Sequence, residues 1–80
     1  MVLNKNEISL DRLPIGAKAS VKSLISDGAT RRRMLDLGVI SGTEIEPLYK
    51  SPSGNPIAYM IRGAVIALRS DVSSQIIVSA

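Results

Sequence analysis

The sequence contains no cysteine and no histidine. Without cysteine the chain has no disulfide and no thiol redox chemistry, and the two absences together exclude zinc fingers and histidine-based catalytic triads. Because small secreted domains normally depend on disulfides, the composition favours a protein of the reducing cytoplasm. A transition-metal ion would find neither imidazole nor thiolate ligands, so we expect no metal site and no cofactor.

Phenylalanine and tryptophan are also absent, and Tyr49 and Tyr59 are the only aromatic residues. The core must therefore be built from aliphatic side chains and methionine. No apolar run is longer than that of residues 64–68, which has the length of a strand and is far short of the ~20 residues of a membrane span. The N-terminus does not resemble a signal peptide. We expect contact with a membrane only through a partner.

Catalytic motifs are missing as well. The chain has neither a phosphate-binding glycine loop nor a nucleophile elbow. Its acidic residues are isolated except for Glu44 and Glu46, and two carboxylates do not supply the six oxygens that calcium or magnesium prefers. The sequence predicts a protein that is not an enzyme and has no catalytic or metal-binding residue.

The residues that are present describe one small folded domain. The chain has 80 residues, of which 45% are apolar and 21% charged, as in globular rather than disordered proteins. We expect residues 1–8 to form a flexible N-terminal segment and residues 9–80 to form the domain. The net charge of +3 permits binding to nucleic acid, acidic lipid or an acidic protein, without distinguishing between them.

The first half of the chain alternates helical and extended patterns. A helical turn is expected at residues 9–13, and polar and apolar residues then alternate through 17–26, as in a half-buried strand. Asp27 is a suitable N-cap for a helix that continues to about Leu37. Gly38 is well placed as the left-handed residue that ends this helix.

The second half is dominated by short strands. A strand is expected at 43–50, where Pro47 favours an edge or a bulge because it lacks a backbone donor. The other predicted elements are strands 57–62, 64–69 and 76–78 and a helical turn at 70–75. About five strands with one short helix and a helical turn predict a mainly β protein, a small closed or partly closed barrel.

The basic cluster Arg31-Arg32-Arg33 lies on the predicted helix. At about 100° per residue, Arg31 falls inside the apolar arc with Leu35, whereas Arg32 falls on the opposite, solvated side. An arginine on an apolar stripe either packs its stem against the core and pairs its head, or marks a contact surface. We expect Arg31 at the seam between helix and barrel, with a buried stem, and Arg32 in water.

From Leu35 to Gly42 the chain runs Leu-Asp-Leu-Gly-Val-Ile-Ser-Gly, which resembles the FeoA family, ferrous iron transport protein A. Arg31 matches the arginine of the family pattern, and Leu37 and Gly38 match its Leu-Gly pair. Residues 54–57, 62–69 and 76–78 resemble the later family motifs, so the likeness extends from about residue 10 to 78. Ser41 replaces a common proline and Asn55 a common aspartate.

The resemblance implies an SH3-like barrel and a cytoplasmic accessory role in bacterial ferrous iron uptake. The partner it implies is FeoB, the permease with a cytoplasmic GTPase domain, and we expect a monomeric binding module that docks there. The candidate partner-binding or structural residues are Arg31, Leu35, Leu37, Gly38, Tyr59, Arg62 and Arg69.

Two other interpretations remain open. The protein could regulate GTP hydrolysis with an arginine finger from residues 31–33, although arginines on a regular helix are poorly suited to that role. It could also be a small barrel that binds nucleic acid, as its basic charge permits. The shortage of stacking aromatics and the interspersed acidic residues argue against this, so no nucleic acid partner is expected.

Overall fold

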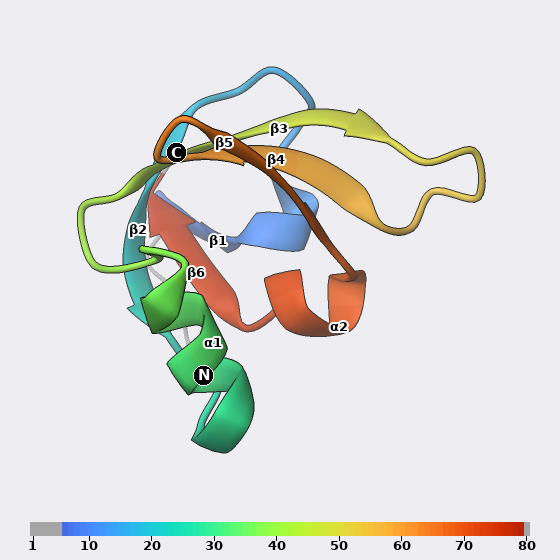
Figure 1. Ribbon diagram of the computed structural model, residues 1–80. Coiled ribbons are helices and arrows are strands. Elements are labelled where there is room, and N and C mark those ends of the chain that lie inside the picture. The colour runs from blue at the N-terminus through green and yellow to red at the C-terminus, as the bar shows by residue number, and fades with distance from the viewer. Residues whose placement is uncertain (1–5, 80) are drawn as a thin grey trace.

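The computed structural model describes residues 6–79 and consists mainly of one antiparallel sheet (Figure 1). Its six strands lie in the order β1-β6-β2-β3-β4-β5 and curl into a small barrel. The elements are β1 (Glu7–Ser9), the 3-10 helix η1 (Leu10–Arg12), β2 (Ala19–Leu24), α1 (Gly28–Asp36), β3 (Glu44–Lys50), β4 (Ile57–Ile61), β5 (Ala64–Leu68), α2 (Ser70–Ser73) and β6 (Ile76–Ser79). The predicted fold class is confirmed.

One strand was not expected from the sequence. β1 pairs with β6, with Ile8 opposite Val78, and Ile8 packs against the core. The prediction of a flexible segment is therefore wrong for Glu7 and Ile8, because pairing with the strongly apolar β6 orders a strand too short to have a clear pattern of its own. Residues 1–5 of that predicted segment lie outside the described residues.

Of the two predicted alternatives for β3, an edge or a bulge, the structure has the bulge, between Pro47 and Tyr49, and the strand lies between β2 and β4. The pairing of β2 with β3 covers Ala19 and Ser20 only. Beyond it, the Pro47 carbonyl accepts a 2.8 Å hydrogen bond from the amide of Gly16 in a loop. The N and C=O of one strand residue point the same way, so the donor that proline lacks would face this loop and not the β4 ladder.

The barrel interior contains side chains from nearly every element, and alternation along β4 shows how they are selected. Ile57, Tyr59 and Ile61 are buried, whereas Ala58 and Met60 between them are half-buried on the other face. Period-two alternation therefore places one face of the strand in the core. The buried hydrophobic residues of this core are Leu10, Leu13, Ala19, Val21, Met34, Val39, Ile45, Ile57, Tyr59, Ile61, Leu68, Ile76 and Val78.

Helix α1 ends in a Schellman arrangement, as the glycine predicted. Gly38 has a φ of 90° and its amide donates to the Leu35 carbonyl, while the Val39 amide donates to the Met34 carbonyl. Met34 and Val39 are both buried, which supplies the apolar contact typical of this motif. At the other end Asp27 occupies the N-cap position, but its side chain makes no capping hydrogen bond, unlike the prediction. The helix is therefore held mainly at its C-terminal end.

Strands β4 and β5 form a hairpin whose turn is Arg62-Gly63, with φ of 50° and 81°. Two positive φ values are those of a type I′ turn, which prefers asparagine, aspartate or glycine at both positions. Arginine at the first position is unusual, since the left-handed conformation costs a non-glycine residue about 1–2 kcal/mol. The fold keeps Arg62 in a conformation that its backbone does not favour.

Candidate protein-binding surface

Four side chains on and around α1 form an exposed surface of mixed apolar and basic character. Leu35 is 42% exposed and Ile40 is 46% exposed. Arg31 and Lys22 line the same shallow depression of about 240 Å³. We call these residues, Lys22, Arg31, Leu35 and Ile40, the α1 surface. Two exposed aliphatic anchors beside two cations are suited to a protein partner.

Arg31 is fixed at the side of this surface by the barrel itself. Its Nη1 donates a 3.1 Å hydrogen bond to the carbonyl oxygen of Leu24, the last residue of β2. The predicted pairing of the guanidinium is thus confirmed, but the predicted buried stem is wrong, because Arg31 is exposed. Met34 is the only residue of α1 that is buried. The helix therefore contacts the barrel through fewer residues than the predicted apolar arc, which also included Arg31 and Leu35. Arg32 is exposed, as predicted.

Gly38 and Arg62, far apart in the sequence, meet at a second place that we call the Gly38–Arg62 junction. The position that a Cβ on Gly38 would take is already occupied by the δ-methylene of Arg62. Gly38 is therefore required twice, for its positive φ and for this close approach. Leu37, the residue before it, is half-buried against the core. Gly38 and Arg62 therefore form the joint between α1 and the β4–β5 hairpin.

Tyr59 belongs to the interior, with no exposed area. Burial raises the pKa of its phenol above the ordinary 10.0, the Ser73 hydroxyl opposes this increase, and the Asp11 carboxylate adds to it. The Tyr59 Oη, Ser73 Oγ and Asp11 Oδ1 atoms are all buried without a hydrogen-bond partner among the described residues. Tyr59 is a structural residue and cannot contact a partner directly.

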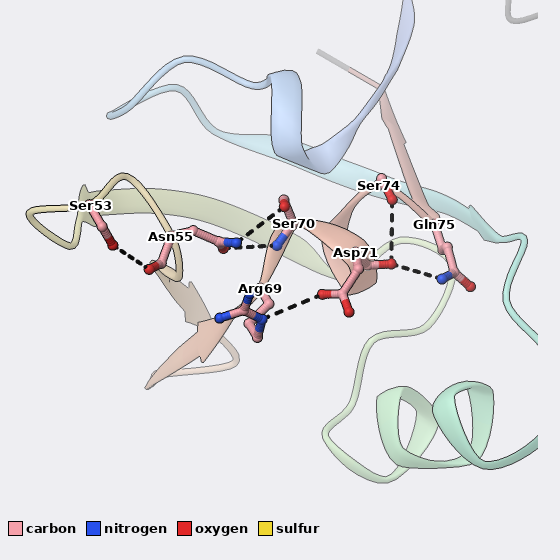
Figure 2. Close-up of polar contacts among 7 residues, drawn as sticks. All are labelled: Ser53, Asn55, Arg69, Ser70, Asp71, Ser74 and Gln75. Atoms are coloured by element: carbon pink, nitrogen blue, oxygen red, sulfur yellow. Dashed lines mark hydrogen bonds and ion pairs between the residues drawn. The ribbon is translucent and has the colours of Figure 1, made fainter.

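Arg69 lies on another part of the surface, beside α2. Its Nε is 3.9 Å from Asp71 Oδ1, and both side chains are largely exposed (Figure 2). The start of α2 is held by Asn55, whose Oδ1 accepts a 3.0 Å hydrogen bond from the Ser70 amide. Arg69 and Arg31 line different grooves, so the sequence-predicted candidates do not form one site.

The two neighbouring carboxylates on β3 do not make a metal centre. Glu44 and Glu46 line a depression together with Lys18 and Arg62, whose positive charges compete with any bound cation. Within residues 6–79, no three acidic side chains gather in a way that could hold a metal ion. In the same part of the chain, no helix is long and apolar enough to cross a membrane.

Comparison with known proteins identifies the family. The model of the FeoA domain matches residues 8–80, almost the whole chain. The chain belongs to the FeoA family. The resemblance predicted from residues 35–42 and the later motifs is confirmed, and FeoA proteins are small SH3-like proteins of iron uptake.

Solved FeoA structures share the fold closely. A FeoA-like protein from Clostridium acetobutylicum is 32% identical with a TM-score of 0.86, over 96% of this chain and 90% of that one. The FeoA of Chlorobium tepidum is 32% identical with a TM-score of 0.84, over 90% and 69% of the two chains. Among curated proteins, none matches this chain.

The FeoA of Stenotrophomonas maltophilia, solved with zinc, is 28% identical with a TM-score of 0.81, over 90% of this chain and 89% of that one. That protein is described as a prokaryotic SH3 domain protein, with a suggested role as a ferrous iron transport activating factor. The SH3-like architecture expected from the sequence is thereby confirmed for this FeoA domain.

Two residues of the α1 surface were missed in the sequence. Ile40 follows the helix and Lys22 lies on β2, so no helical or strand periodicity connects them with Arg31. The Schellman turn at Gly38 reverses the chain and brings Ile40 back beside the helix. The sequence does contain a sign of this surface: two apolar residues, Val39 and Ile40, directly follow the glycine that ends the helix. Only one of the two can pack inward against the helix, so the other is expected to be exposed.

Proposed function

We propose that this FeoA protein is a non-catalytic accessory protein of ferrous iron uptake that acts in the cytoplasm. In this proposal it docks through the α1 surface on the cytoplasmic GTPase-bearing part of a FeoB-like permease and reaches the membrane only through that partner. The observation that carries the proposal is the pair of exposed aliphatic side chains, Leu35 and Ile40, beside a guanidinium already fixed in place.

The α1 surface has the features of a small protein-binding hot spot. Interface energy concentrates in a few apolar anchors and in arginine, surrounded by contacts that exclude water. The bond from Arg31 to the Leu24 carbonyl holds the long side chain before any partner arrives, which lowers the entropy lost on binding. Four N–H donors of the guanidinium remain for carboxylates or carbonyls of the partner.

The experiment compares Arg31→Ala with its neighbour Arg32→Ala. Arg31→Ala should lower the free energy of unfolding by about 0.5–1.5 kcal/mol, because one hydrogen bond is lost, and Arg32→Ala by less than about 0.5 kcal/mol. Titration with the isolated GTPase domain of the matching permease should show binding about tenfold weaker for Arg31→Ala and unchanged within about twofold for Arg32→Ala.

The amide spectrum locates the surface in the same titration. Shifts should cluster at Arg31, Leu35 and Ile40. Shifts confined to other parts of the barrel, with both variants binding equally, would refute docking through the α1 surface. No shift in either nucleotide state of the domain would refute the partner.

A further inference from the structure

Strand β5 is an edge strand of the sheet, and the pairing with β4 shows which of its backbone groups have no partner strand. The pair that flanks a two-residue hairpin turn, Ile61 and Ala64, exchanges both of its backbone hydrogen bonds, and the pattern then alternates along the strands. The N–H and C=O groups of Val65 and Ala67 consequently point away from β4. No group of residues 6–79 bonds to them. Two residues of β5 thus offer a complete set of donors and acceptors.

A groove lies beside the C-terminal half of this edge and is lined by residues of β5, α1 and α2. Figure 1 shows where these three elements lie. It has a volume of about 290 Å³, and its apolar wall is formed by Met34, Ala67, Leu68 and Val72. Groove and edge meet at Ala67. A chain that paired with β5 would therefore be able to place a side chain in this groove.

The rim of the groove is mainly basic. Arg33 and Arg69 lie on it, and the side chain of Arg33 has no hydrogen bond or ion pair within residues 6–79. Arg69 has the single 3.9 Å contact with Asp71, which is also on the rim and is the one charge that opposes an acidic ligand (Figure 2). Both groups of this pair are largely exposed, so the pair is weak and easily replaced.

We propose that the β5 edge binds an extended acidic segment of a partner protein, which adds a strand to the sheet. Backbone groups of the segment bond to Val65 and Ala67, and an acidic side chain lies between Arg33 and Arg69. Strand addition of this kind takes its affinity from main-chain hydrogen bonds and its specificity from the neighbouring pocket. The proposal goes beyond the docking function above, because it uses a different surface.

A second copy of this chain fits the same edge poorly. A symmetric antiparallel pair centred on Ile66 would place Val65 opposite the second copy's Ala67. At both ends of that pairing, Arg69 of one copy would lie opposite Gly63 of the other, one residue from Arg62. Like charges across strands are destabilising, and each copy carries a net charge of +3. The charges favour an acidic peptide and a monomeric protein.

The test is a titration of the whole chain with a short blocked peptide in which valine alternates with aspartate and glutamate. The control peptide has lysine at every acidic position. We expect the acidic peptide to slow hydrogen exchange at the Val65 and Ala67 amides by at least about fivefold and to shift the Arg33 and Arg69 side-chain resonances. We expect no effect from the lysine peptide. Equal effects of the two peptides, or protection elsewhere in the chain, would overturn the proposal.

Matched variants separate the site from general electrostatics. Arg33→Glu should weaken the acidic peptide by about tenfold, whereas Arg32→Glu, the same charge change on the neighbouring exposed residue, should weaken it by less than about threefold. Ala67→Pro removes an edge donor but no bond to β4, and should abolish the protection at Val65. If Ala67→Pro does not fold, the Arg33 and Arg32 comparison decides the matter, and equal losses in those two variants contradict the proposal.

Discussion

The two sides of α1 are made by neighbouring residues and have opposite roles. Met34 is 1% exposed and packs with Val39 under the helix, where Gly38 and Arg62 close the joint to the hairpin. Leu35, the next residue, is 42% exposed and lies with Arg31 and Ile40 on the outer side. Substitutions of the buried residues on the inner side should lower the free energy of unfolding. The exposed residues on the outer side contribute little to it.

In this short helix the inner residues should determine stability, and the outer residues should determine binding. Substitutions on the inner side should cost folding free energy and affect binding only through the fold. Substitutions on the outer side should leave the fold intact and cost binding.

The largest contrast is expected between Met34→Ala and Leu35→Ala. Met34→Ala leaves a cavity in the core and should lower the free energy of unfolding by about 2–5 kcal/mol. Leu35→Ala should lower it by less than about 1 kcal/mol, since the side chain is already half in water. Denaturant unfolding measures both values. Equal losses would mean that the helix does not present these faces.

The Gly38–Arg62 junction is tested by comparing two glycines with the same φ. Gly42 has a φ of 93° and open space where a Cβ would lie, so Gly42→Ala should cost about 1–2 kcal/mol from backbone strain alone. Gly38→Ala should cost about 1 kcal/mol more, because the new methyl group displaces the Arg62 side chain.

Arg62→Ala is the control that assigns this extra cost. In an Arg62→Ala background the difference between the two glycine substitutions should disappear, which thermal or urea unfolding of the four variants would show. If the difference persists without Arg62, another contact of Gly38 is responsible.

The smallest effect at neutral pH is expected for Tyr59→Phe. The buried hydroxyl has no hydrogen-bond partner among the described residues, so its removal should change stability by less than about 1 kcal/mol at pH 7. Burial raises the pKa of Tyr59 in the folded state above the ordinary 10.0. The folded state therefore holds this proton more tightly than the unfolded chain does.

It follows that stability is unaffected by this group below pH 10.0 and decreases as the pH rises through the folded-state pKa. Tyr59→Phe should remove part of this decrease in unfolding curves recorded at successive alkaline pH values. Tyr49→Phe is the control and should keep the wild-type dependence, because Tyr49 is 54% exposed. Identical alkaline profiles for wild type and Tyr59→Phe would contradict the argument.

Local patterns predicted most of the elements. The alternation through Ile57, Tyr59 and Ile61 placed β4 and its buried face, and Gly38 marked the end of α1. Such features depend on residues that are close together in the sequence, so they can be predicted from a single sequence. The order and spacing of the motifs from residue 31 to 78 also identified the family.

The position of each element in the barrel was decided by contacts between distant parts of the chain. β1 is ordered by β6, and β3 can carry Pro47 between two neighbouring strands because the donor that proline lacks would face the loop at Gly16 and not β4. Arg62 covers Gly38, and Arg31 finds the Leu24 carbonyl at the end of another strand. Sequence alone set the periodicity, the turns and the composition of the core, because these are local properties of the chain. Only the tertiary structure decided which exposed residues share a surface, because that depends on how the sheet curls and where α1 is held against it.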